Sequence, residues 1–276
     1  MKKLILEIVL QITGLSSASG LYYTNNDIYL IGDDSQYLYQ YSLETKDLNK
    51  IALVENAKET ISKKEKPDFE ALTYQNQTFF AFGSGSKENR EFVSITTLPN
   101  KESFQVPLDV LYTSIANFAS MDKDELNIEG AFFKGDELYL FNRGNGKNNR
   151  NFIAIIQGKN FAEEFNIILQ DIKLPKLNGI PTGFSDAILV ENTIYFLATA
   201  EGAKSTYNDG KIAGTILGTI SLKNLKLKST QILSDTKKLE GITLFKQTGK
   251  NKTFLLCEDN DDKNATSTIF KVEVKK

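Results

Sequence analysis

The chain has 276 residues, a formal net charge of −2, one cysteine and no histidine. A length of this order suits one large domain, and single all-β domains often reach it. A net charge so close to zero argues against nucleic acid or an anionic membrane as the main partner. The lack of histidine excludes Ser–His and Cys–His catalysis and zinc sites built on imidazole, and a single cysteine excludes an internal disulfide.

The first predicted element is a β-strand over residues 3–10. Its basic start and apolar residues are superficially similar to a signal peptide, but Glu7 and Gln11 interrupt the apolar run. Its aliphatic residues alternate with period two, at Leu4, Leu6, Ile8 and Leu10. We therefore predict a strand rather than a leader. With no transmembrane stretch and a cysteine content that fits a reducing compartment, we expect a cytoplasmic protein.

A short pattern with an acidic or polar third residue and a small fourth residue recurs five times. The copies are SASGL at 17–21, DFEAL at 68–72, NIEGA at 127–131, FSDAI at 184–188 and KLEGI at 238–242. The small residues follow one another at intervals of 51, 59, 57 and 54 residues. Such regular spacing indicates internal structural repeats.

Each copy begins a tract of short predicted strands. Second strands are expected at 27–31, 78–82, 137–141, 193–197 and 253–256. Third strands are expected at 37–43, 92–98, 152–156, 215–222 and 268–274, and a fourth, more polar strand completes the first four units, as at 48–54 and 227–233. Units of about 50 residues that form four-stranded meanders are typical of propeller blades. We predict an all-β, five-bladed β-propeller, with a six-bladed propeller as the alternative.

The fifth unit ends after three strands, and the strand over 3–10 supplies the missing fourth. This closure removes two exposed sheet edges at once. We predict one domain over 1–276, with blades at about 12–56, 57–119, 120–176, 177–234, and 235–276 plus 1–11. A helix is expected over 109–119, where apolar residues follow Pro107 at helical spacing, at Leu108, Leu111, Tyr112 and Ile115.

The first strand of a meander is antiparallel to the second, so its start lies beside the end of the second strand. The third residues of the pattern should therefore share one end of the central channel with the tracts that follow the second strands. Those third residues are Glu70, Glu129, Asp186 and Glu240, and the tracts lie at 32–34, 83–86, 142–145, 200–202 and 258–259. This end of the channel should be strongly acidic.

The chain has 30 lysines but only three arginines, Arg90, Arg143 and Arg150, all after the second strands of blades two and three. The guanidinium fork pairs with carboxylates or phosphates in bidentate fashion, which lysine cannot do. We predict a site for a small anionic molecule, lined by Glu70, Ser84, Ser86, Arg90, Glu129, Asn142, Arg143, Arg150, Asp186 and Glu240. The alternative is structural: the carboxylates cap backbone N–H groups and the arginines neutralise the acidic ring.

The patterns at 68–72 and 127–131, together with GSGS at 83–86 and FNRGN at 141–145, resemble an uncharacterised bacterial propeller family. That family is related to the phytase-like and SdiA-regulated propellers, and the resemblance spans the whole chain. It implies calcium at the channel mouth and, in some members, hydrolysis of phosphate esters. The chain shows neither the full acidic set nor the length of phytase-like propellers, so activity does not carry over.

A metal site and two further functions remain open at this point. Glu70, Glu129, Asp186 and Glu240 could hold calcium through oxygen ligands, which would suit a calcium-dependent phosphoesterase or lactonase-like hydrolase. The third function is a protein-interaction platform. The acidic run at 258–262 lacks the glycine and terminal glutamate of an EF-hand loop, so we expect a solvated hairpin tip there. Neither catalysis nor the oligomeric state follows from the sequence.

Overall fold

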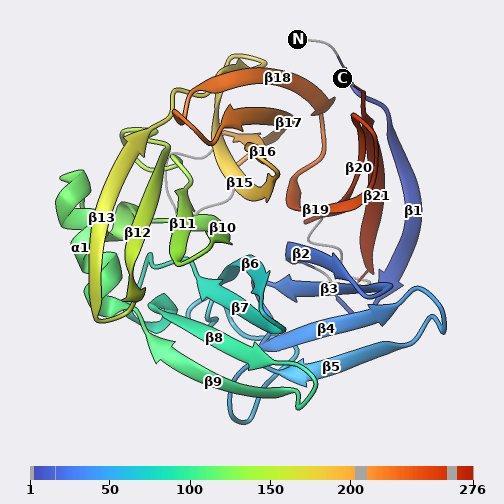
Figure 1. The fold of residues 1–276 in the computed structure, drawn as a ribbon, viewed down its shortest axis with the longest axis horizontal. Helices are drawn as coiled ribbons and strands as arrows, with labels where there is room; N and C mark the ends of the chain where they lie inside the picture. Colours follow the sequence, from blue (N-terminus) through green and yellow to red (C-terminus); the bar gives the residue numbers. More distant parts are fainter. Residues whose placement is uncertain (1–2, 16, 203–209, 260–265, 276) are drawn as a thin grey trace.

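The computed structural model describes residues 3–15, 17–202, 210–259 and 266–275. Its strands form five sheets around a common axis, one for each repeat (Figure 1). The five-bladed propeller is confirmed, and the six-bladed alternative is wrong. Within the described ranges, no helix is both long and apolar enough to cross a membrane.

Blades one to three are four-stranded antiparallel meanders, numbered from the axis outwards. Blade one contains β2 (Ala18–Thr24), β3 (Asp27–Gly32), β4 (Tyr37–Ser42) and β5 (Leu48–Ala52). Blade two contains β6 (Phe69–Gln75), β7 (Thr78–Gly83), β8 (Phe92–Thr97) and β9 (Glu102–Pro107). Blade three contains β10 (Ile128–Lys134), β11 (Glu137–Asn142), β12 (Phe152–Asn160) and β13 (Glu164–Asp171).

Blades four and five depart from this plan, each in its own way. Blade four has a fifth, two-residue strand and contains β14 (Lys176–Leu177), β15 (Ile180–Val190), β16 (Thr193–Glu201), β17 (Ile212–Ser221) and β18 (Leu227–Ser234). Blade five contains β19 (Leu239–Thr248), β20 (Asn251–Glu258) and β21 (Thr266–Val274), completed on the outside by β1 (Leu6–Thr13).

The N-terminal strand closes the ring, as predicted. β1 pairs antiparallel with β21 from Leu6, opposite Val272, to Thr13, opposite Thr266. The strand begins later than residue 3, because the first residues contact blade four instead. Lys3 forms a parallel bridge with Ile232 of β18. The start of the described chain therefore touches blade four before β1 completes blade five on the outside of β21 (Figure 1).

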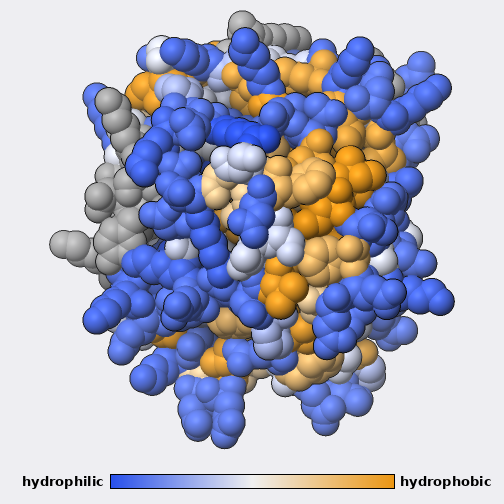
Figure 2. Space-filling view, turned by 90° about the vertical axis from the view of Figure 1, so that its left-hand side faces the viewer, coloured by the Kyte–Doolittle hydropathy of each residue, from blue (hydrophilic) through white to orange (hydrophobic). Residues whose placement is uncertain are grey.

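The predicted helix over 109–119 is confirmed as α1 (Asp109–Ala119), which lies beside blade three. Its buried face joins the apolar core between blades two and three, and the hydroxyl of Tyr112 donates to the carbonyl of Gly83 at 2.8 Å. Val110 and Phe118 face solvent. Figure 2 views this side and shows apolar surface among charged side chains. Two short 3-10 helices, η1 (Glu88–Arg90) and η2 (Lys123–Glu125), lie in the loops.

A β-bulge interrupts the innermost strand of every blade at the repeated pattern. The bulged residues, each skipped in the pairing register, are Ser19, Glu70, Glu129, Ser185 and Glu240. In blade four the bulged residue is therefore Ser185. The sequence pattern predicted Asp186 as the counterpart of the bulged glutamates, which is wrong by one residue. A bulge re-aims its side chain relative to the regular alternation. Here that shift directs a polar residue of each blade towards the axis.

A small residue follows the bulge in every blade except blade four, where Asp186 stands between Ser185 and Ala187. It is small because neighbouring inner strands approach closely. Consecutive inner strands contact one another around the ring, including β10 with β15. A Cβ added at Gly130 would lie 2.9 Å from the backbone nitrogen of Ala187 in blade four. The recurrent Gly or Ala is thus a packing requirement at the axis.

Candidate functional site

The hairpin register of the inner strands assembles a polar layer at one end of the axis. Phe69 lies opposite Gly83, Ile128 opposite Asn142, and Leu239 opposite Glu258. In these blades the bulged residue therefore lies beside the end of the second strand, as the meander geometry predicts, whereas in blade four the bulge follows Phe184, opposite Ala198, short of the end of β16. Two ion clusters, described next, occupy this layer.

The first cluster is centred on Arg143, which follows β11 and is 3% exposed. Its Nη1 lies 3.0 Å from both carboxylate oxygens of Glu129 and 3.3 Å from Glu240. Its Nη2 lies 2.6 Å from Glu201 at the end of β16. Burial lowers the pKa of Arg143, but the three carboxylates raise it further, so the guanidinium stays charged. Arg143 thus joins blades three, four and five.

Lys238, just before β19, extends this cluster. Its Nζ lies 2.9 Å from Glu240 and 2.6 Å from Asp259. Burial raises the pKa of Glu129 and of Glu240, and the nearby cations only partly offset it. The carboxylates of this cluster outnumber its two cations, which leaves the cluster short of positive charge.

The second cluster is centred on Lys66, in the loop that leads into blade two. Its Nζ contacts Asp33, which follows β3, and lies 3.0 Å from Asp68, which precedes β6. Asp68 also accepts from Nη1 of Arg90 at 2.5 Å and from Ser84 at 2.6 Å. Burial and nearby carboxylates raise the pKa of Asp33 to about 6, although Lys66 opposes the shift.

Glu70, on the bulge of β6, differs from these groups because no hydrogen bond or ion pair engages its carboxylate among the described residues. The residue as a whole is half-buried, and its carboxylate lies among the other acidic side chains of the polar layer. Desolvation raises its pKa, and the neighbouring carboxylates of Asp68, Glu129, Asp33 and Glu240 raise it further. The carboxylate oxygens of Glu70 are therefore available to coordinate a cation.

Asp186 plays the capping role that the structural alternative proposed. Its two oxygens accept from the backbone N–H groups of Ala187 and Ile242, both at 2.7 Å. Burial raises its pKa, and these two bonds only partly offset that effect. Ser185, the true counterpart of the bulged glutamates, donates to the carbonyl of Leu239 at 2.9 Å. Asp186 thus ties blade four to blade five.

The remaining predicted residues hold loops in place. The side chain of Asn142 accepts from the backbone of Asn127 at 2.8 Å and donates to the carbonyl of Arg150 at 3.0 Å. Arg150 itself pairs with Asp171 at 2.8 Å, on the outer strand of its blade, away from the two clusters. Ser86 lies 3.0 Å from Arg90 and 3.1 Å from Ser84.

The structure adds cluster members that the sequence interpretation left out of the site. They are Asp33, Lys66, Asp68, Glu201, Lys238 and Asp259. A weak signal existed for the lysines, since Lys66 and Lys238 stand shortly before bulged glutamates. The expectation of a solvated hairpin tip at 258–262 is wrong for Glu258 and Asp259, which are buried and paired with lysines. Residues 260–262 lie outside the described ranges.

The carboxylates best placed for a metal ion are Asp33, Asp68 and Glu70, which can each offer one oxygen within 4.8 Å of the others. Of the four residues predicted to form a calcium ring, only Glu70 belongs to this set. Glu129 and Glu240 are bound to Arg143, and Asp186 is bound to backbone. The geometry therefore shifts the candidate metal position towards blades one and two.

Comparison with known proteins adds the family. The profile of a family of unknown function (DUF6929) matches residues 14–274. The chain belongs to this family. The expectation of an uncharacterised propeller family is therefore confirmed, and the relation to phytase-like and SdiA-regulated propellers stays a prediction. A search of curated proteins gave no match.

Solved structures similar to this DUF6929 protein share its fold at low sequence identity. Glutaminyl cyclase from Myxococcus xanthus is 10% identical, with 99% of each chain covered and a TM-score of 0.54. A luciferin-regenerating enzyme is 7% identical, with 98% of this chain and 95% of the other covered and a TM-score of 0.53. PQQ-bound aldose sugar dehydrogenase from Streptomyces coelicolor is 11% identical, with 98% of each chain covered and a TM-score of 0.52. These likenesses concern the fold alone.

Proposed function

We propose that this protein is a ligand-binding propeller whose axial end holds a hard divalent cation, calcium first, between Asp33, Asp68 and Glu70. The observation that supports the proposal is the unengaged carboxylate of Glu70 beside two further carboxylates, with oxygens that fit within 4.8 Å of one another. Calcium accepts six to eight oxygen ligands in flexible geometry, so water would complete the shell.

The charge balance of the layer favours a cation over the small anion predicted from the arginines. Lys66 and Arg90 face three carboxylates. Burial raises the pKa values of Asp33 and Glu70 most, and the neighbouring carboxylates raise them further. Arg143 and Arg90 are already bound to carboxylates, and Arg150 pairs with Asp171. An incoming anion would have to displace those partners, whereas a cation would relieve the repulsion.

Lys66 is the built-in competitor for this position, because its ammonium group contacts Asp33 and Asp68. A divalent cation has to displace that ammonium group before all three carboxylates can act as ligands. A cation held there would polarise a bound water or a substrate oxygen. This is the chemistry that the alternative of a calcium-dependent hydrolase requires, and it depends on cation binding first.

A small anion remains the second candidate ligand, because one nitrogen of Arg90 has no partner. The Nε of Arg90 is buried and has no hydrogen-bond partner among the described residues. An orphaned guanidinium N–H next to the hydroxyls of Ser84 and Ser86 suits a phosphate or carboxylate oxygen. Inorganic phosphate should then raise the melting temperature of the wild type but not of Arg90→Lys.

Calorimetric titration and thermal unfolding with calcium test the main proposal. Calcium at millimolar concentration should raise the melting temperature, and Glu70→Gln should abolish the rise. Glu102→Gln, on the exposed outer strand of the same blade, is the matched control and should leave it intact. Lys66→Met should strengthen calcium binding by removing the competitor. The proposal is wrong if calcium neither binds to, nor raises the melting temperature of, the wild type and the Lys66→Met variant.

A further inference from the structure

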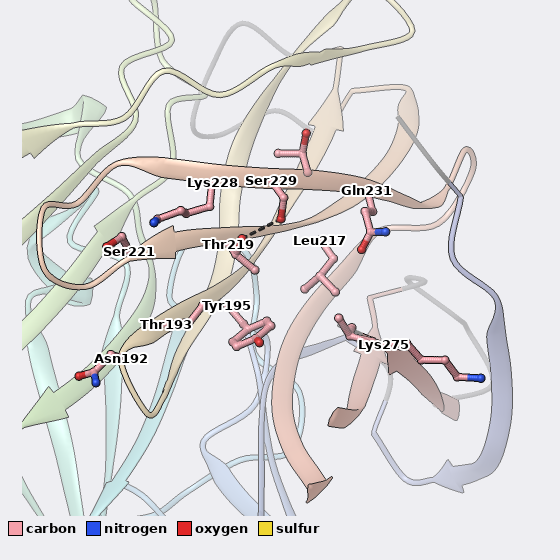
Figure 3. Close-up of a pocket in the computed structure, with 12 residues that line it drawn as sticks. Asn192, Thr193, Tyr195, Leu217, Thr219, Ser221, Lys228, Ser229, Gln231 and Lys275 are labelled. Carbon is pink, nitrogen blue, oxygen red and sulfur yellow. Dashed lines mark hydrogen bonds between the residues drawn. The ribbon is translucent and has the colours of Figure 1, made fainter. Parts of the chain in front are cut away.

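A groove of about 620 Å³ lies between blades four and five, far from the axial clusters. Its wall is the face of blade four, with side chains from β16, β17 and β18, and the end of β21 lines it from blade five (Figure 3). Near the axis the two blades are in contact, with the rings of Tyr195 and Phe254 4.8 Å apart. The first residues of the chain also bridge the two blades, since the N–H of Leu4 donates to the carbonyl of Ile232 on β18 at 2.8 Å.

The wall of the groove carries polar groups without partners. Side chains alternate along a strand, so Thr193 on β16, Thr219 on β17 and Ser229 and Gln231 on β18 share one face. The hydroxyls of Thr219 and Ser229 pair at 2.7 Å (Figure 3). No side-chain hydrogen bond within the described ranges engages Thr193 or Gln231. Both side chains can therefore bind a ligand that both donates and accepts hydrogen bonds.

The charge of the groove is opposite to that of the axial layer. No aspartate or glutamate lines it, although the chain has 35 of them, and two lysines do: Lys228 and Lys275. Figure 3 shows these lysines at opposite ends of the groove. Tyr195 and Leu217 form the floor between them and are 8% and 3% exposed. Such a lining suits a neutral or anionic ligand and disfavours a cation.

A second groove of about 380 Å³ shares Gln231 and Lys275 with the first and continues towards Lys3 and Glu7. The acidic residues of this extension are engaged, since Glu7 pairs with Lys271 at 3.0 Å and Glu273 lies 3.9 Å from Lys275. The combined shape is elongated, so it can accept more than one unit of a linear ligand. The face of a sheet presents side chains rather than free backbone groups, which disfavours an added peptide strand.

We infer that the groove between blades four and five binds an acidic oligosaccharide. Every sugar hydroxyl both donates and accepts, which matches the threonine, serine and glutamine side chains of the wall. The exposed edge of Tyr195 on the floor of the groove contacts the apolar face of a sugar ring, and the lysines pair with its carboxylates. The volume lies in the usual range for small-ligand sites. This inference is independent of the axial cation.

The test uses NMR titration of the full-length, isotope-labelled protein with trigalacturonate, and with maltotriose as the neutral comparison. Trigalacturonate should shift the amide signals of β17 and β18, and Ser229→Ala should weaken its binding about fivefold, as the loss of one hydrogen bond does. Ser103→Ala is the matched control, because Ser103 forms the same kind of cross-strand pair with Thr96 on blade two, at 2.8 Å.

Two results would overturn the inference. One is the absence of any shift with millimolar trigalacturonate, and the other is binding that Ser229→Ala and Ser103→Ala affect equally. A Lys228→Met/Lys275→Met double variant should lose the preference for trigalacturonate over maltotriose. Equal binding of both trisaccharides by the wild type would contradict the role given to the lysines.

Discussion

Nη1 of Arg143 lies 3.0 Å from each carboxylate oxygen of Glu129. The pair follows from the hairpin of blade three, where β10 and β11 bring Ile128 opposite Asn142, and the bulge at Glu129 re-aims its carboxylate. The same guanidinium reaches Glu240 and Glu201 on two other blades. Arg143 therefore stabilises the packing of three blades.

Arg143→Lys should lower the free energy of unfolding by about 1.5–3 kcal/mol, although the charge is kept. The lysine ammonium is a single point charge and cannot reach three carboxylates on separate blades as the guanidinium fork does. Thermal and denaturant unfolding of wild type and variant measure the effect. Because the partners of Arg143 are internal, the loss should appear in stability rather than in affinity for phosphates or carboxylates.

Arg150→Lys is the control for that comparison. Arg150 pairs with Asp171, a residue whose side chain is 61% exposed. Exposed ion pairs contribute about 0–1 kcal/mol, so this change should cost less than Arg143→Lys, although it also removes the bond from Arg150 to the carbonyl of Ala119. Equal stability of Arg143→Lys and Arg150→Lys would contradict the structural role of the Arg143 cluster. A variant that is as stable as wild type but no longer binds an anion would favour the anion site instead.

The fold was accessible from the sequence because its repeat is long and regular. The five patterns, the strand over 3–10 and the helix over 109–119 each depend on local periodicity, which the chain shows plainly. The site was less accessible. In blade four, Ser185 and Asp186 are adjacent polar residues, and only the pairing register shows which one is bulged. That register is set by the pairing with the neighbouring strand, so it cannot be predicted from the local sequence.

The lysines of the clusters were equally hard to identify. The chain has 30 lysines, and most lie where a solvated charge is expected. Lys66 is buried and the side chain of Lys238 is 15% exposed, and both bind carboxylates because their loops cross the axial layer, which is a tertiary property. The arginines, being rare, were noticed first, but Arg150 is peripheral. The rarity of arginine therefore led to the central residue Arg143, but it also led us to assign Arg150 to the site, where it does not lie.

Closure by β1 should account for a large part of the stability. Deletion of residues 1–11 removes most of the outer strand of blade five and leaves an open edge on β21, so we expect insoluble or strongly destabilised protein. A milder comparison uses two isoleucines of the same strand. Ile12 is 2% exposed, whereas Ile8 is 65% exposed.

Ile12→Ala should cost about 2–5 kcal/mol as a buried truncation, and Ile8→Ala should cost little. Urea unfolding of both variants measures the difference. If the truncated protein lacking residues 1–11 melts at the wild-type temperature, the strand does not close the propeller in solution. Equal effects of the two alanine substitutions would lead to the same conclusion.

The buried carboxylates should make the protein more stable at mildly acidic pH than at neutral pH. Burial and neighbouring carboxylates raise the pKa of Asp33 to about 6, and the pKa of Glu70 is raised by the same causes. An unfolded aspartate or glutamate has a pKa of about 4. Between these values the folded protein keeps protons that the unfolded chain has lost. The free energy of unfolding therefore falls as pH rises from about 4 through 6, and it levels off only above the raised pKa values of Glu70, Asp186 and Glu240.

Melting temperatures measured from pH 4.5 to pH 8 at constant ionic strength test this dependence. We expect a decline of the order of 1–3 kcal/mol in stability across the window, since one pKa unit corresponds to about 1.4 kcal/mol. Asp33→Asn should flatten the curve near pH 6, because one titrating group is gone, whereas Glu102→Gln on the exposed outer strand should leave it unchanged. Calcium competes with protons for the same oxygens, so its stabilising effect should be larger at pH 7.5 than at pH 5. A melting temperature that rises from pH 5 to pH 7.5 without calcium would show that these carboxylates are ionised and well paired in the folded state. The cation proposal depends on a shortage of positive charge around them, so that result would contradict it.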